Sequence, residues 1–120
     1  MGIVEVLKGM GDETRIRIMN VLRKDTLCVC DMEEILKISQ SNVSRHLTKL
    51  RSCKLITSEK KAQWVYYSLN NGYIDKHPFV AELLATELDK LPQCRKDLAR
   101  LKKYRELGGD CIHKVNVEGE

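Results

Sequence analysis

The segment that most constrains the fold is 31–50, which reads as two short helices joined by a tight turn. Its first half carries apolar residues at helical spacing, which predict one buried face: Met32, Ile35 and Leu36. In its second half Ser39 is a suitable N-cap, and apolar residues follow at i, i+4 and i+7: Val43, Leu47 and Leu50. The pattern therefore predicts a scaffold helix, a turn and a second helix.

The rest of the second helix is polar and rich in hydrogen-bonding groups. Amides, hydroxyls and a guanidinium near the first turns of a helix are the groups that read base edges and phosphates in the major groove. The residues with this predicted role are Gln40, Ser41, Asn42, Ser44, Arg45, His46 and Lys49. A solvated amphipathic helix without a ligand is the alternative, and the helical pattern alone leaves it open.

The distribution of charge favours a polyanionic partner. The whole chain has a net charge of only +4, but segment 41–70 holds six cationic side chains against Glu59 alone, a net charge of +5. Segment 25–38 carries a net charge of −3. A uniformly solvated surface does not require this segregation, so we expect double-stranded DNA to be the partner of the second helix.

A β-hairpin is predicted directly after the second helix. Segments 55–59 and 64–69 are β-branched and aromatic runs that flank 60–63. Lys60 and Lys61 would lie at its tip, where they can contact phosphates. A basic hairpin in this position is a wing, so the expected fold is a mainly α winged helix-turn-helix.

The C-terminal third is predicted to be helical. Apolar residues from Tyr73 to Leu91 recur at helical spacing, with Pro78 in a first turn and Pro92 at the end. One long helix with so wide an apolar face suggests, together with the first helix, a homodimer interface. We divide the chain into a DNA-binding and dimerisation domain, 1–92, and a helical extension with a loose tail, 93–120.

The compartment in which the protein is expected determines whether its cysteines are thiols or disulfides. The chain shows neither a signal-peptide pattern nor an apolar run long enough to span a membrane, so we expect a cytoplasmic protein without membrane contact. Its five cysteines are then thiols, ligands or core residues rather than a disulfide framework. Cys28 and Cys30 immediately precede the scaffold helix, where thiolates would suit a thiophilic ion if the turn is irregular, although two small buried hydrophobes fit equally well.

An enzyme is not expected. His46, His77 and His113 fall in unrelated elements, and the sequence has neither a glycine-rich phosphate loop nor a nucleophile elbow.

From residue 4 to residue 91 the chain resembles the ArsR/SmtB family of winged-helix, metal-sensing repressors. Segment 11–18 is similar to that family's second helix, 41–47 to its recognition helix and 64–67 to its second wing strand. The resemblance implies the order α-α-α-α-β-β-α and a homodimeric repressor of operator DNA that needs no cofactor to bind DNA. In the wing, Ala62 stands where relatives commonly have glycine, so a positive φ would be strained there.

Segment 27–31, Leu-Cys-Val-Cys-Asp, resembles the effector box of arsenic and cadmium sensors. The resemblance implies that Cys28 and Cys30 bind the effector and that binding releases the operator. The expected effector is As(III) or Sb(III), with Cd(II) or Pb(II) as the alternative. Glu33 occupies the place of a third cysteine in many arsenic sensors, so a third thiolate would come from Cys94 or Cys111.

The resemblance also bears on a zinc site. Zinc sensors of the family place Asp-x-His at the start of the last helix, which Asp75 and His77 match, but Leu88 and Leu91 stand where the second ligand pair would be. A zinc site is therefore not expected. Two rival functions remain. One is a repressor on the same scaffold that responds to thiol oxidation or to persulfides. The other is a winged helix that contacts only proteins, which the net charge of +5 in segment 41–70 disfavours.

Overall fold

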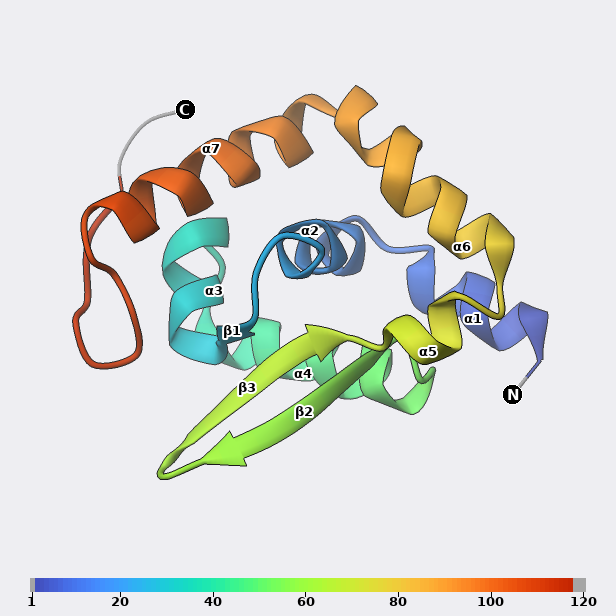
Figure 1. The fold of residues 1–120 in the computed structure, drawn as a ribbon, viewed down its shortest axis with the longest axis horizontal. Helices are drawn as coiled ribbons and strands as arrows, with labels where there is room; N and C mark the ends of the chain where they lie inside the picture. The colour runs from blue at the N-terminus through green and yellow to red at the C-terminus, as the bar shows by residue number, and fades with distance from the viewer. Residues whose placement is uncertain (1, 118–120) are drawn as a thin grey trace.

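The computed structural model describes residues 2–117, and the domain boundaries at residues 1 and 120 therefore lie outside it. The chain forms a helical body with a protruding β-hairpin, and its C-terminal segment arches over the helices (Figure 1). The elements in order are α1 (Ile3–Met10), α2 (Glu13–Leu22), β1 (Leu27–Cys28), α3 (Val29–Leu36), α4 (Gln40–Ser52), β2 (Ile56–Lys61), β3 (Trp64–Leu69), α5 (Asn71–Ile74), α6 (Pro78–Glu82), the π-helical turn η1 (Leu83–Glu87), the 3-10 turn η2 (Leu88–Lys90) and α7 (Pro92–Glu106).

The predicted pair of helices is α3 and α4. α3 ends at Lys37, which adopts a left-handed conformation with φ of 57°. After this turn Ser39 caps α4 by accepting the backbone N–H of Asn42. The predicted apolar residues of both helices are buried, so α3 and α4 pack against each other through one core. The winged helix-turn-helix prediction is confirmed.

A small antiparallel sheet of order β1-β3-β2 joins the wing to the start of α3. The predicted hairpin is formed by β2 and β3, with Lys61 opposite Trp64 next to the tip. The sequence reading missed β1, in which Leu27 pairs with Tyr67 and Cys28 with Tyr66. This short strand fixes the backbone of Cys28 to the root of the wing.

The prediction of one long helix from Tyr73 to Leu91 is wrong. The region instead consists of α5, α6, η1 and η2. Proline lacks a backbone N–H and disfavours helical backbone at the residue before it, so the helix restarts with Pro78 at its first position. The irregular turns still bury Leu84 and Leu88, which is why the apolar spacing resembled one continuous helix.

α7 is held to the body by a buried ion-pair network. The Asp97 carboxylate is fully buried and accepts hydrogen bonds from Arg17 of α2 and from Arg100. These two arginines also donate to the carbonyl oxygens of Leu36 and Ile35, which lie in the last turn of α3. α7 therefore packs on α2, and one arginine from each of these two helices satisfies a C-terminal carbonyl of α3.

The prediction of a loose tail after α7 is also wrong for the described residues. The segment 107–117 turns back along α3, as the red loop in Figure 1 shows. Cys111 and Val117 are buried, and the backbone N–H of Val117 donates to the carboxylate of Glu34. Among residues 2–117 no helix is long and apolar enough to cross a membrane.

Candidate functional site

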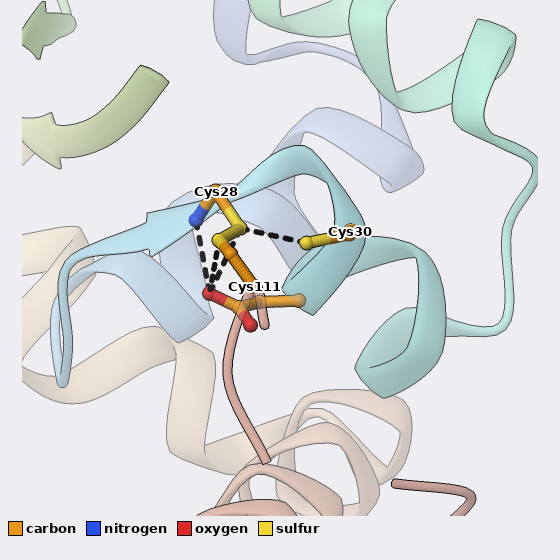
Figure 2. A group of neighbouring side chains, drawn as sticks. Cys28, Cys30 and Cys111 are labelled. Atoms are coloured by element: carbon orange, nitrogen blue, oxygen red, sulfur yellow. Dashed lines mark hydrogen bonds between the residues drawn. A yellow bond between two sulfur atoms is a disulfide. The ribbon is translucent and has the colours of Figure 1, made fainter. Parts of the chain in front are cut away.

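The junction between β1 and α3 brings the side chains of Cys28 and Cys30 together. Two residues apart on a regular helix, their side chains would diverge. Cys28 instead has extended backbone and is the N-cap of α3, whereas Cys30 lies in the first turn. The two Sγ atoms are 2.9 Å apart, so both can reach one ligand (Figure 2).

Asp31 completes the start of α3. Its Oδ2 accepts the backbone N–H of Cys28 at 3.1 Å and lies 3.3 Å from the Cys28 Sγ. This carboxylate is 1% exposed. A carboxylate at the N-terminus of a helix satisfies a free N–H and the positive end of the dipole, so the residue has a structural reason to be there.

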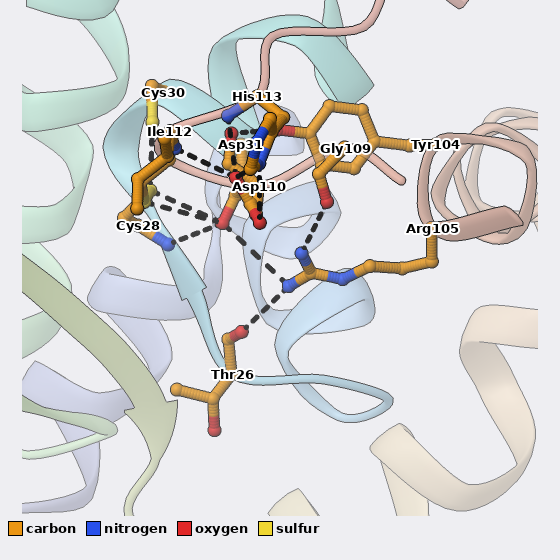
Figure 3. The surroundings of a disulfide bond; sticks show 11 residues. Thr26, Cys28, Cys30, Asp31, Tyr104, Arg105, Gly109, Asp110, Ile112 and His113 are labelled. Carbon is orange, nitrogen blue, oxygen red and sulfur yellow. Dashed lines mark hydrogen bonds and ion pairs between the residues drawn. A yellow bond between two sulfur atoms is a disulfide. The ribbon is translucent and has the colours of Figure 1, made fainter. Parts of the chain in front are cut away.

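The tail brings a third sulfur to this junction. Cys111 lies on the loop that returns from α7 and forms a disulfide with Cys28 in this structure (Figures 2 and 3). One ligand atom from each of Cys28, Cys30, Asp31 and Cys111 lies within 4.8 Å of every other. Within the described residues this group unites both predicted ligands with one of the two predicted tail cysteines, from the same chain.

Cys94, the other predicted tail cysteine, is not part of this group. It is buried in α7, and its backbone carbonyl accepts a hydrogen bond from Asn20 of α2. Cys53 is also buried, packed against Gly9 of α1. Both behave as small core residues.

Tyr104 and Arg105 at the end of α7 support the cysteine group, and the sequence reading missed both. The Tyr104 hydroxyl donates to Asp31 Oδ1 at 2.6 Å and to the carbonyl of Asp110 at 3.2 Å. Arg105 donates to the carbonyl of Gly109 and pairs with Asp25, while one of its nitrogens lies 3.8 Å from Asp31 Oδ2 (Figure 3). These contacts tie α7, the tail and the start of α3 together.

A tight turn directs Cys111 inward. The Asp110 Oδ1 accepts the backbone N–H groups of Ile112 and His113, which folds the chain around this carboxylate. Ile112 and His113 are exposed, whereas Cys111, which lies between Asp110 and Ile112, is buried.

The protonation of the group is set by its surroundings. Burial raises the pKa of the Cys30 thiol, and the charge of Asp31 adds to the increase. Burial and the hydrogen bond to Asp31 raise the pKa of Tyr104 far above its usual range, so its hydroxyl stays a donor. Cys30 is the partly exposed member of the group and lines a cavity of about 400 Å³ that opens to solvent. At neutral pH Cys30 is therefore a protonated thiol that a small solute can reach.

α4 and α7 lie on opposite sides of the helical body (Figure 1). Of the predicted reading residues, Asn42 and Ser44 are half-buried, while four are exposed: Gln40, Ser41, Arg45 and Lys49. The Arg45 guanidinium donates to the Asn42 side chain at 2.6 Å, which holds both groups at the surface. Their role as DNA contacts stays a prediction.

His46 does not belong with this exposed set. Its ring is buried, with Nδ1 3.2 Å from Arg15 Nη1 and 3.8 Å from Asp12 Oδ1, so it links α4 to the start of α2. Burial lowers the pKa of His46, helped by Arg45 and Arg15 and opposed by Asp12. His46 is thus a core residue of the helix pair, which corrects its assignment to the reading surface.

The wing carries Lys60 and Lys61 exposed on its outer end. Lys61 lies over the ring of Tyr66, 5.9 Å from its centroid. Ala62 in the hairpin turn has φ of 56°, the left-handed conformation that the sequence reading identified as strained for this residue.

The sequence is similar to a known protein family and to known repressors. Residues 12–58 match the family model described as "Bacterial regulatory protein, arsR family". The arsenical resistance operon repressor of Escherichia coli is 33% identical over 95 residues, which cover 78% of this chain and 75% of that protein. The arsenic resistance transcriptional regulator ArsR1 of Pseudomonas putida is 41% identical over 66 residues, 54% of this chain and 52% of its own length.

The fold has solved counterparts. The homodimeric winged helix-turn-helix domain Mb0332 of Mycobacterium bovis superimposes with a TM-score of 0.61 at 18% identity, over 71% of this chain and 79% of that one. This likeness concerns the fold. The chain spans only about half of the length of the Pseudomonas putida relative, and the matched relatives are named as transcriptional regulators rather than enzymes. On the match to the Escherichia coli repressor, together with the family model over its helix-turn-helix, the chain belongs to the ArsR family of bacterial regulatory proteins.

Proposed function

We propose that the protein is a homodimeric, cytoplasmic repressor that leaves its operator when a trivalent arsenical or antimonial ion binds Cys28, Cys30 and Cys111. The observation that carries the proposal is the meeting of these three sulfurs at the first turn of α3, the helix that packs against α4. The repressors of arsenical resistance among its relatives support the same class of effector.

The chemistry of the group suits a trivalent metalloid. Arsenous acid, As(OH)₃, condenses with three thiols to give a neutral trithiolate and three molecules of water, so the thiol protons leave as water. A protonated, partly buried thiol such as Cys30 is a suitable starting state for this reaction. The reaction requires the reduced form of the Cys28–Cys111 pair.

The net charge of the bound complex favours the metalloid over divalent ions. A divalent cation bound by three thiolates leaves a net charge of −1 beside the buried Asp31 carboxylate, which is 3.8 Å from the Arg105 guanidinium. The neutral trithiolate adds no charge to this environment, and uncompensated buried charge is costly. Cd(II) and Pb(II) are therefore the weaker candidates, although Asp31 could offer them a fourth ligand.

DNA binding is assigned to the exposed face of α4 and to the wing. Amide, hydroxyl and guanidinium groups of α4 would enter the major groove, and the wing lysines would contact phosphates. Dimerisation would cover Ile3, Val4 and Leu7, which form an exposed apolar face on α1.

Titration of a labelled operator complex of the reduced protein tests the effector. We expect arsenite and antimonite to release the operator, Cd(II) and Pb(II) to act weakly and Zn(II) not to act. Replacement of Cys28, Cys30 or Cys111 by serine should abolish release without loss of DNA binding. Cys53→Ser and Cys94→Ser are the matched controls and should respond normally; a normal response of Cys28→Ser/Cys30→Ser would place the sensor elsewhere.

A parallel titration tests the reading surface. Arg45→Ala should weaken operator binding by about 1–3 kcal/mol if the guanidinium reads a base. Lys61→Ala should mainly reduce the dependence of affinity on salt, because a phosphate contact releases counterions. An unchanged binding isotherm for Arg45→Ala would remove this residue from the interface.

Release by oxidation is the second candidate, and the Cys28–Cys111 disulfide is the observation that favours it. One feature weighs against it. The disulfide-bonded structure has a complete wing and exposed side chains on α4, so the bond is compatible with the surface that we assign to DNA.

A further inference from the structure

We propose that oxidation of Cys28 and Cys111 to their disulfide disables the effector site while the protein continues to bind its operator. The inference rests on the function proposed above and adds a regulatory state to the same site. In that state the protein would be a repressor that no longer responds to the metalloid.

The disulfide removes ligands from the effector site. The disulfide uses two of the three sulfurs, because Cys28 is bonded to Cys111. Cys30 remains as a free thiol, with its Sγ 2.9 Å from that of Cys28. A single thiol cannot form the trithiolate, and within the described residues neither remaining cysteine belongs to the group. Oxidation and metalloid binding therefore exclude each other.

The DNA-binding elements are complete in the disulfide-bonded structure. Cys28 pairs with Tyr66 of the wing, and its backbone N–H donates to Asp31. Ser39 caps α4, and Arg45 is exposed beside Asn42. The disulfide is therefore compatible with the wing and with the exposed face of α4 that we assign to DNA.

The tail is held next to the start of α3 in this structure. The bond joins residues 83 positions apart and fixes the returning loop to α3. The Tyr104 hydroxyl bridges the same two segments by donating to both Asp31 and the carbonyl of Asp110. The pairing of Cys28 with Cys111 is therefore favoured by contacts that already hold the loop in place, whereas Cys94 is held elsewhere by α2.

The redox step balances with a hydroperoxide as the oxidant. One thiol is oxidised to a sulfenic acid as the O–O bond breaks and, for hydrogen peroxide, one water leaves. The second thiol then attacks the sulfenic sulfur, the S–S bond forms and a second water leaves. Two thiols lose two electrons, and the peroxide gains them; a dithiol reductant reverses the change.

The test compares the reduced full-length protein with the same protein treated with hydrogen peroxide, in a Cys53→Ser/Cys94→Ser background that confines oxidation to the site. Peptide mapping by mass spectrometry identifies the disulfide. Fluorescence anisotropy of a labelled operator then measures DNA binding and its release by arsenite. Treatment of the oxidised sample with a dithiol, followed by removal of the dithiol, is the recovery arm.

The proposal expects a Cys28–Cys111 disulfide, an operator affinity within about twofold of the reduced protein, and loss of the arsenite response that returns after reduction. Operator release by peroxide alone would overturn it in favour of the redox repressor. Normal release by arsenite in the oxidised sample, or a Cys28–Cys30 disulfide, would also overturn it. Reduced protein that ignores arsenite would instead refute the proposed function, so the two failures are distinguishable.

Discussion

Gly109 controls whether the third thiol reaches the start of α3. A methyl group at this position would lie 2.6 Å from Cε1 of Tyr104 and 2.7 Å from two other ring atoms. The ring cannot move aside easily, because Tyr104 is buried and its hydroxyl is held by Asp31. Gly109→Ala should therefore push the loop that carries Cys111 away from α7.

The size of the effect follows from the clash. Overpacking a well-packed site costs about 1–3 kcal/mol. The loop avoids this cost if it leaves α7, but Cys111 then moves away from Cys28 and Cys30. If docking of the loop is coupled to ion binding, the arsenite affinity of the reduced protein falls by about five- to 150-fold. Operator affinity should remain unchanged, since the bonds that hold the loop are made with Cys28, with α3 and with α7.

The assay is an arsenite titration of reduced protein followed by sulfur-to-arsenic charge-transfer absorbance, with the rate of alkylation of Cys111 as a second readout. Gly109→Ala should bind arsenite weakly and expose Cys111 to alkylation. Gly72→Ala is the matched control, because an added methyl there meets only the Asn70 side chain at 3.9 Å. Wild-type arsenite affinity in Gly109→Ala, with Cys111 still protected, would refute the role assigned to the loop.

The other predictions concern stability, measured by urea denaturation. Ala62→Gly should raise the free energy of unfolding by about 1 kcal/mol, because glycine relieves the left-handed strain and loses part of that gain to backbone entropy; an unchanged midpoint would contradict this. Asp97→Ala should lower it by about 3–5 kcal/mol, since Arg17 and Arg100 lose a buried partner; a loss below about 1 kcal/mol would show that the network is dispensable. The pKa of His46 is lower in the folded than in the unfolded chain, so the unfolded state binds the proton more readily and stability should decrease as pH falls below about 6.5. His46→Gln should flatten that pH dependence, and an equally steep profile would exclude His46 as its source.

The local patterns of the sequence were sufficient for much of the fold. Helical spacing in 31–50 and the basic hairpin after it predicted α3, α4 and the wing, because each is encoded by neighbouring residues. The same pattern also held the information that His46 is buried. The apolar face of α4 is formed by positions i, i+3, i+4 and i+7, which are Val43, His46, Leu47 and Leu50. The prediction gave the polarity of the His46 side chain more weight than its position on this face.

The candidate site could be predicted only in part. Cys28 and Cys30 are close in sequence and could be paired once an irregular turn was allowed. Cys111 is 83 residues from Cys28, and its arrival depends on the direction of α7 and on the turn at Asp110. Tyr104 carries no local signal at all, because its role as a donor to Asp31 exists only after α7 has packed against α3.

α3 is held at both of its ends by the C-terminal region, but by bonds of different kinds. At its last turn the Leu36 carbonyl accepts from Arg17 of α2 and the Ile35 carbonyl from Arg100 of α7, and both arginines pair with Asp97 of α7. At its first turn the attachment runs through the sulfur atoms of Cys28 and Cys111, whose bonding would change with the effector and with the redox state under the two proposals. Under the proposed function, a bound metalloid would therefore act on one end of α3 while the other end stays anchored, and the difference would reach α4 through their common core. Since such coupling is reciprocal, operator DNA must weaken metalloid binding by the same factor with which the metalloid weakens DNA binding.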